Sequence, residues 1–184
     1  MIKAQMDRTL TVVQGEFRIS DQPGDLLSTV LGSCVAVCLY DPKRRIGGMN
    51  HFLLPFGQET ATDRPVRYGL FAMESLINAL MKAGAVKSRL EAKIFGGARI
   101  SVDLRDIGRT NAVFAREFLA TEGIDCSGES LGGTNARRVV FRPTTGQARM
   151  LIVPSTDVAP PPPPMVRRAP QTAVKLSEGQ AEAP

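Results

Sequence analysis

Residues 31–55, LGSCVAVCLYDPKRRIGGMNHFLLP, predict two strands around one turn. Apolar, strand-forming residues stand on both sides of Asp41 and Pro42, a pair typical of turns, so the two halves should pair as an antiparallel hairpin. The same stretch holds the only histidine of the chain, His51, and two of its three cysteines. The pairing of these strands therefore decides whether a thiol and an imidazole lie side by side.

A regular hairpin brings Cys34 close to His51. If the turn is centred between Pro42 and Lys43, the two residues lie directly opposite each other; if it is centred a residue later, they are diagonal neighbours. In both registers their side chains share one face, with Cβ atoms roughly 5–8 Å apart. Such a distance permits a thiolate–imidazolium pair after modest adjustment.

The residues around Cys34 suit a nucleophile. Gly32 and Ser33 precede it, so the backbone can approach a substrate closely, and the Cys34 amide can donate to an oxyanion. An imidazolium at His51 would lower the pKa of the thiol from its reference value of about 8.5.

The alternative is a structural role for both residues. A cysteine in an apolar strand is usually an inert small hydrophobe, and a single histidine is more often structural than catalytic. The spacing alone leaves both interpretations open, and we interpret Cys38 and Cys126 as packing residues. Cys34 and Cys38 on one strand would stand about 13 Å apart, too far for one zinc ion. No metal or cofactor is expected.

The rest of the chain predicts an α+β fold, a sandwich of β-strands with flanking helices. Two stretches show helical spacing of apolar residues and end at a glycine, 66–83 before Gly84 and 110–122 before Gly123. Residues 144–147, TTGQ, predict a turn that joins the last two strands as a hairpin. The predicted strands are 10–13, 17–19, 26–31, 34–40, 46–54, 92–95, 138–142 and 148–153.

Composition predicts one soluble domain, residues 1–154, followed by a disordered proline-rich tail, residues 155–184. No apolar stretch approaches the roughly 18 residues that cross a bilayer, and the N-terminus lacks a signal-peptide pattern. We therefore expect a cytoplasmic protein without membrane insertion. The net charge of +5 suits an acidic partner surface or a nucleic acid. Since the basic residues are scattered and no nucleic-acid motif stands out, a solvated basic surface is favoured.

Several segments, in order along the chain, resemble the chemoreceptor glutamine deamidases, the CheD family. They are LGSCVAVCLYDP at 31–42, GGMNHFLLP at 47–55, LEAKIFGGARI at 90–100, DIGRTNA at 106–112 and SLGGTNARRVVF at 130–141. The similarity covers roughly residues 10–153 and does not include the tail. It implies a protein-glutamine deamidase that converts glutamines of methyl-accepting chemotaxis receptors to glutamates in sensory adaptation. It also implies a fold related to a deamidating bacterial toxin.

The resemblance further implies roles for single residues. Cys34 matches the nucleophile and His51 the general base. The third residue of the family is a threonine six positions before the cysteine; that position here is Ser28, with Thr29 beside it, and serine keeps the hydroxyl. Some family members also bind a CheC-type phosphatase, so a non-catalytic binding regulator is the alternative function.

Overall fold

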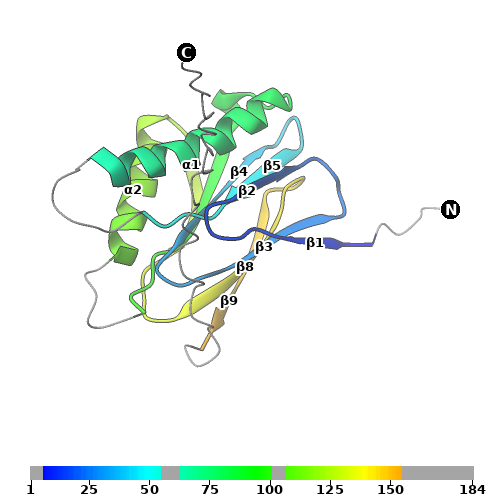
Figure 1. Cartoon of the computed structure of the whole chain (residues 1–184). Coiled ribbons are helices and arrows are strands. Elements are labelled where there is room, and N and C mark those ends of the chain that lie inside the picture. The colour runs from blue at the N-terminus through cyan, green and yellow to red at the C-terminus, as the bar shows by residue number, and fades with distance from the viewer. Residues whose placement is uncertain (1–5, 55–62, 101–106, 155–184) are drawn as a thin grey trace, which may run out of the picture.

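The computed structural model of the chain describes residues 6–54, 63–100 and 107–154. This part of the chain forms three layers: two helices, a five-stranded sheet and a four-stranded sheet (Figure 1). The elements are β1 (Arg8–Thr11), β2 (Phe17–Ser20), β3 (Asp25–Leu31), β4 (Val35–Asp41), β5 (Ile46–Asn50), α1 (Asp63–Lys82), a 3-10 turn (Lys87–Arg89), β6 (Glu91–Gly96), α2 (Ile107–Thr121), β7 (Asp125–Leu131), β8 (Ala136–Arg142) and β9 (Gln147–Val153). The predicted α+β sandwich is confirmed.

The two sheets have different strand orders. The five-stranded sheet runs β2-β5-β4-β6-β7 and the four-stranded sheet runs β1-β3-β8-β9. Most neighbours are antiparallel, but β6 pairs with β7 and β1 with β3 in parallel. The β6–β7 connection passes through α2, as a parallel pair requires a crossover. The predicted hairpin of the last two strands is confirmed as β8 and β9.

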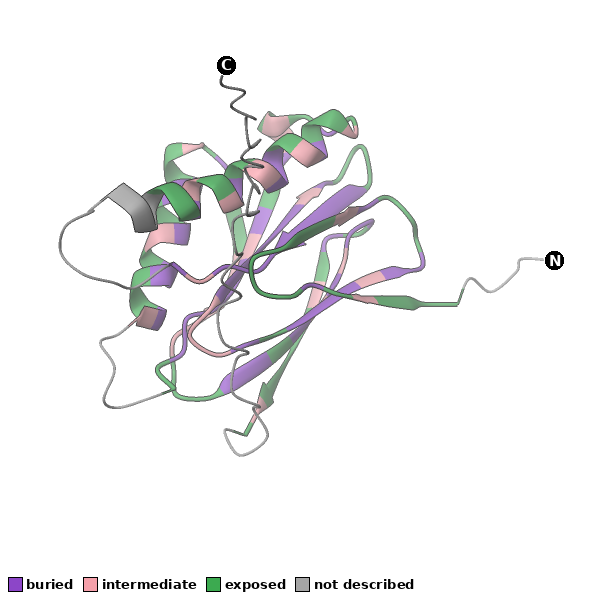
Figure 2. Cartoon of the chain, viewed as in Figure 1, coloured by how far each residue is buried: buried purple, intermediate pink, exposed green. Residues whose placement is uncertain are grey.

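Strand β4 lies in the middle of the molecule and is buried on both faces (Figure 2). Val35, Val37 and Leu39 point into the apolar cluster that α1 and α2 cover. Ala36 and Cys38 point the other way, into the cluster between the two sheets. Alternation along one strand therefore assigns its odd and even residues to two different cores.

Both helices end where glycine predicts. Gly84 follows α1 with a φ of 97°, and Gly123 follows α2 with a φ of 65°, a left-handed conformation that favours glycine. The amide after each glycine turns back to the helix: Ala85 N–H donates to the Leu80 carbonyl at 3.0 Å, and Ile124 N–H to the Leu119 carbonyl at 2.9 Å. α1 begins three residues before the predicted start, and α2 also begins three residues early.

Strand β7 was not predicted from the sequence. Its residues, DCSGESL, include Asp, Ser, Gly and Glu, which are poor strand formers. It forms because its main chain pairs along the full length of β6, with a register shift at Ala92 and Lys93. As the edge of the sheet it is largely exposed, so it lacks the apolar alternation by which a strand is recognised.

The predicted tail, residues 155–184, lies outside the described residues. Its disorder and the domain boundary at residue 154 therefore stay predictions.

Candidate active site

The β4–β5 hairpin has its turn one residue later than a centre between Pro42 and Lys43. Leu39 pairs with Gly48, and the same register continues to an isolated bridge between Val35 and Phe52. Cys34 and His51 are therefore diagonal neighbours on the face toward the four-stranded sheet, the second of the two registers that the sequence allows.

A buried carboxylate fixes this turn. Asp41 accepts hydrogen bonds from the main-chain N–H groups of Lys43 and Arg44, both at 3.0 Å, and of Val86 at 2.9 Å. The guanidinium of Arg89 lies 2.7 Å from the carboxylate. Burial alone would raise the pKa of Asp41, but Arg89 and the N–H donors outweigh it and hold the pKa well below its usual range. The ionised carboxylate thus holds the register on which the Cys34–His51 geometry depends.

The main chain of His51 is bound to the turn between β1 and β2. His51 N–H donates to the Glu16 carbonyl at 3.0 Å, and the His51 carbonyl accepts from Gly15 N–H at 2.7 Å. One residue earlier, Asn50 Oδ1 accepts from the Val37 N–H at 2.9 Å, so a side chain takes an N–H of the central strand. His51 therefore uses its main-chain N–H and carbonyl to bind the β1–β2 turn, and so connects the hairpin to that turn.

The hydroxyl of Thr29 sets the tautomer of His51. Thr29 Oγ1 donates to the Val12 carbonyl at 2.7 Å and lies 2.8 Å from His51 Nδ1. Since its proton goes to the carbonyl, the hydroxyl accepts from Nδ1–H; the Val12 carbonyl, 3.3 Å from Nδ1, can only accept as well. In a neutral imidazole the other nitrogen, Nε2, is then unprotonated. Nε2 is buried without a hydrogen-bond partner in the described part of the chain, so it can receive a proton.

The sequence analysis assigned Ser28 to the position beside His51. The structure corrects this, because the hydroxyl in contact with the imidazole belongs to Thr29. Thr29 shares the inner face of β3 with Leu27 and Leu31, which lie in the cluster between the sheets. Ser28 is also buried but points to the opposite face. Its even spacing from Cys34 does not imply a shared face, because the chain leaves one sheet at Leu31 and enters the other at Val35.

Cys34 is partly exposed, and its thiol donates to Gln14 Oε1 at 3.4 Å. Burial raises the pKa of the thiol to about 11, against the opposing effect of its own main-chain N–H. Burial lowers the pKa of His51, against the opposing effect of the Val12 carbonyl. At neutral pH the structure thus holds a neutral thiol and a neutral imidazole. The expected lowering of the thiol pKa by an imidazolium does not occur, because burial disfavours both charges.

Two segments that the sequence did not assign to the site, α2 and the residues after β6, hydrogen-bond to the loop that carries Cys34. Asn111 on α2 is fully buried and donates to the Ser33 carbonyl at 2.9 Å, while its Oδ1 accepts from Leu54 N–H at 2.9 Å. Gly97 N–H donates to the Cys34 carbonyl at 2.8 Å. A Cβ on Gly96 would lie 2.1 Å from that carbonyl oxygen, so only glycine permits the contact. The sequence signal for this contact is Asn111 itself, a polar residue on the apolar face of a predicted helix.

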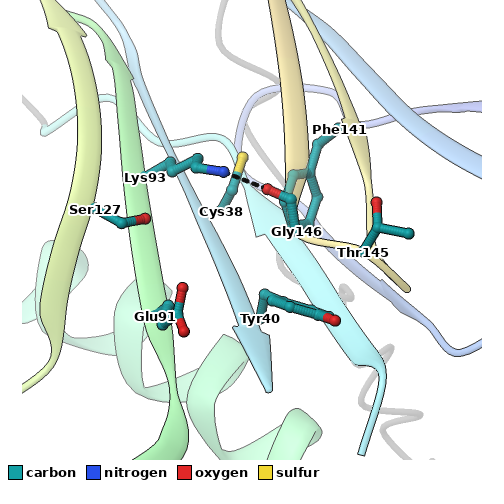
Figure 3. A pocket seen from close by; sticks show the side chains of 8 residues that line it. All are labelled: Cys38, Tyr40, Glu91, Lys93, Ser127, Phe141, Thr145 and Gly146. Atoms are coloured by element: carbon teal, nitrogen blue, oxygen red, sulfur yellow. Dashed lines mark hydrogen bonds between the residues drawn. The ribbon is translucent and has the colours of Figure 1, made fainter. Parts of the chain in front are cut away.

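A small pocket lies away from Cys34, between the sheets at Cys38 (Figure 3). Its volume is about 50 Å³, room for one or two water molecules and not for a glutamine side chain. Lys93 crosses its mouth to donate to the Gly146 carbonyl. Cys38 is 1% exposed and belongs to the inter-sheet core, as expected of a packing residue. Cys126, in contrast, is exposed on the edge strand β7, so its interpretation as a packing residue is wrong.

Within residues 6–54, 63–100 and 107–154, no three His, Cys, Asp or Glu side chains are grouped as metal ligands would be. Over the same residues, neither helix combines the length and apolar character needed to traverse a bilayer.

A thiol, an imidazole with a free nitrogen and a hydroxyl that orients the ring are the side-chain set of cysteine-dependent hydrolases. The family model described as CheD chemotactic sensory transduction matches residues 53–151. The chain is 46% identical over 160 residues to a protein of Cereibacter sphaeroides named probable chemoreceptor glutamine deamidase CheD, covering 87% of this chain and 80% of that one. A Caulobacter vibrioides protein of the same name is 49% identical, with 84% and 86% covered. The chain belongs to the CheD family.

Solved structures of similar shape are more distant. The Bacillus licheniformis hypothetical protein YfiH is 16% identical, with a TM-score of 0.44, over 70% of this chain and 61% of that one. The Neisseria meningitidis protein NMB0706 is 15% identical, with a TM-score of 0.39, over 64% and 51%.

Proposed function

We propose that this protein is a chemoreceptor glutamine deamidase, an amide hydrolase that converts glutamine side chains of chemotaxis receptors to glutamates and releases ammonia. The observation that carries the proposal is the Thr29–His51 hydrogen bond, which leaves His51 Nε2 unprotonated on the face that Cys34 shares. The relatives named as deamidases, 46% and 49% identical over most of the chain, support the substrate class.

Cys34 is the proposed nucleophile and His51 the proposed general base and acid. As Sγ attacks the carbon of the substrate carboxamide, the thiol proton moves to His51 Nε2. The tetrahedral intermediate collapses when that proton passes to the leaving nitrogen, which departs as ammonia and leaves a thioester on Cys34. Water then attacks the thioester, with His51 taking its proton, and glutamate is released as the thiol is restored.

Thr29 is the proposed positioning residue. Its hydroxyl accepts from Nδ1–H and so favours the tautomer in which Nε2 is a base. When Nε2 takes the thiol proton, the same contact and the Val12 carbonyl face an imidazolium, and both oxygens stabilise it. Because both groups are neutral at rest, proton transfer accompanies the attack and no standing ion pair precedes it.

The proposed partners are the cytoplasmic parts of chemotaxis receptors, so we propose that the enzyme acts in the cytoplasm. The net charge of +5 suits an acidic receptor surface. Binding to a CheC-type phosphatase is a further proposal and rests on the family resemblance alone.

The test is the mass of a purified chemoreceptor cytoplasmic fragment from Caulobacter vibrioides after incubation with the protein. We expect the gain that replaces an amide NH2 by OH, at specific glutamines, with the wild type and not with Cys34→Ala. No mass gain with the wild type, or the same gain with both proteins, would contradict the proposal.

A further inference from the structure

The turn at residues 13–16 lies against the proposed active site and presents one carboxamide to it. Glu16 N–H donates to the Val13 carbonyl at 3.0 Å, and Gly15 has a φ of 86°, so Gln14 occupies the second position of a turn that needs glycine third. Two hydrogen bonds join this turn to the main chain of His51, from Gly15 N–H and to the Glu16 carbonyl. The backbone of Gln14 is thereby fixed relative to the imidazole.

The side chain of Gln14 reaches the sulfur of Cys34. Its Oε1 accepts from the thiol at 3.4 Å. Its amide nitrogen, Nε2, has no acceptor in the described part of the chain. A carboxamide carries two donors and one acceptor at nearly the same place, and rotation about its terminal bond exchanges them. The group that accepts from a neutral thiol can therefore donate to an anion formed beside the same sulfur.

An attack by Cys34 creates such an anion. When Sγ bonds to the substrate carbon, the amide oxygen on that same carbon becomes an oxyanion. In the free enzyme the Cys34 main-chain N–H lies toward its own sulfur, the atom that bonds the substrate carbon, so it is one donor close to the new oxyanion. Three other donors around this loop are already engaged: Gly97 N–H with the Cys34 carbonyl, Ala98 N–H with the Gly32 carbonyl, and Asn111 Nδ2 with the Ser33 carbonyl.

We propose that Gln14 is a further catalytic residue, whose side-chain N–H donates to the oxyanion together with the Cys34 main-chain N–H. In the free enzyme Gln14 accepts from the thiol; on attack the thiol proton goes to His51, and the carboxamide turns to present its N–H. The proposal rests on the proposed deamidation. It assigns a catalytic function to a residue of the β1–β2 turn, outside the Cys34–His51 hairpin.

The test compares Gln14→Ala and Gln14→Glu with the wild type, using the Caulobacter vibrioides receptor fragment as substrate. Glutamate has the shape of glutamine and keeps the acceptor, but its carboxylate cannot donate. Both variants should lose about 10²- to 10³-fold in kcat with little change in KM, the pattern of an interaction made only in the transition state. The control is Glu16→Gln in the same turn, an exposed side chain that should leave kcat and melting temperature unchanged.

Four results would overturn the proposal: unchanged kcat in Gln14→Ala, a faster Gln14→Ala, wild-type kcat in Gln14→Glu, or a rise in KM alone. A deamidated Gln14 in the wild-type enzyme would also overturn it, because Gln14 would then be a substrate. A wild type without any activity on the receptor fragment contradicts the proposed function itself, and this inference with it. An active wild type with unaffected Gln14 variants removes only the inference.

Discussion

Two cysteines four positions apart, Cys34 just before β4 and Cys38 within it, lie in opposite surroundings. Cys34, just before β4, is partly exposed, contacts Gln14 and shares its face with His51. Cys38, four residues later, is packed in the inter-sheet core beside the small pocket that Lys93 borders. Burial raises the pKa of both thiols.

A nearby cation does not by itself make a buried thiol a nucleophile. Burial raises the pKa of Cys38 and outweighs the opposing charge of Lys93, and no imidazole is among the residues that line the pocket. What distinguishes Cys34 is access to a substrate together with an imidazole nitrogen left free by Thr29. The groups around a thiol therefore decide whether it can act as a nucleophile.

The largest expected effect separates the two cysteines directly. Cys34→Ala should lose deamidation by on the order of 10³-fold or more, because no other group takes the place of the nucleophile. Cys38→Ala should keep nearly full activity and lose about 1–2 kcal/mol of unfolding free energy from core packing. Deamidation assays and urea denaturation measure the two effects. Equal loss of activity in both variants would remove the distinction.

Asp41→Ala tests the register that places Cys34 beside His51. It leaves Arg89 and three main-chain N–H groups without their acceptor, so we expect a loss of about 2–3 kcal/mol in unfolding free energy. Because the folded-state pKa of Asp41 is depressed, its contribution is full above the unfolded value of about 4 and is lost only in stronger acid. Denaturation at pH 7 measures the loss; Lys43→Ala, which keeps the main-chain donor, is the control and should be neutral.

Thr29→Val tests whether the Thr29 hydroxyl fixes the His51 tautomer in which Nε2 is unprotonated. Valine keeps the shape and removes the hydroxyl, so kcat should fall by about 10- to 100-fold while Cys34 remains. Ser28→Ala, the neighbouring change on the opposite face, should leave kcat unaltered. The reverse pattern, a damaging Ser28→Ala and a silent Thr29→Val, would restore the role to Ser28.

The pH dependence of alkylation tests the neutral pair at rest. In a Cys126→Ala background, the rate at which iodoacetamide labels Cys34 should keep rising with pH toward a pKa of about 11. A plateau across neutral pH would instead indicate a preformed thiolate–imidazolium pair. Cys38 should stay unlabelled in the folded protein at every pH.

The smallest expected effect is the pH dependence of stability that arises because His51 is buried in its neutral form. Its folded-state pKa lies below the unfolded value of about 6.5, so the unfolded chain binds more protons between the two values. Its contribution to stability is full above pH 6.5 and is lost as pH falls toward the folded pKa. The melting temperature should therefore drop between pH 7 and pH 5 more in the wild type than in His51→Gln. An equal drop in both would show that other groups carry the dependence.

The sequence predicted the local features of this fold and the pairing of its central hairpin. Turn residues, helix-ending glycines and apolar periodicity act within a few positions, so they identified the hairpin, both helix ends and the shared face of Cys34 and His51. Strand β7 was not predicted, because it forms by pairing with β6, from which α2 separates it in the sequence, and its own residues show no strand pattern.

The sequence also does not decide whether Ser28 or Thr29 contacts His51. The resemblance points to Ser28 with Thr29 beside it, and only the packing of β3 shows that Thr29 faces His51 in the space between the sheets. The contact between Gln14 and Cys34 joins residues 20 positions apart through the β1–β2 turn, and no local pattern reports it. The raised pKa of Cys34 comes from burial by both sheets, which the hairpin alone does not show.

The most direct test of the account is to trap the covalent intermediate and map its position. The receptor fragment and the wild-type protein are mixed, quenched in acid within the first turnovers, digested and analysed by mass spectrometry. We expect a receptor peptide joined by a thioester to the peptide that contains Cys34 in the wild type, and none in Cys34→Ala. A receptor peptide on Cys38 or Cys126, or rapid deamidation by Cys34→Ala, would contradict it.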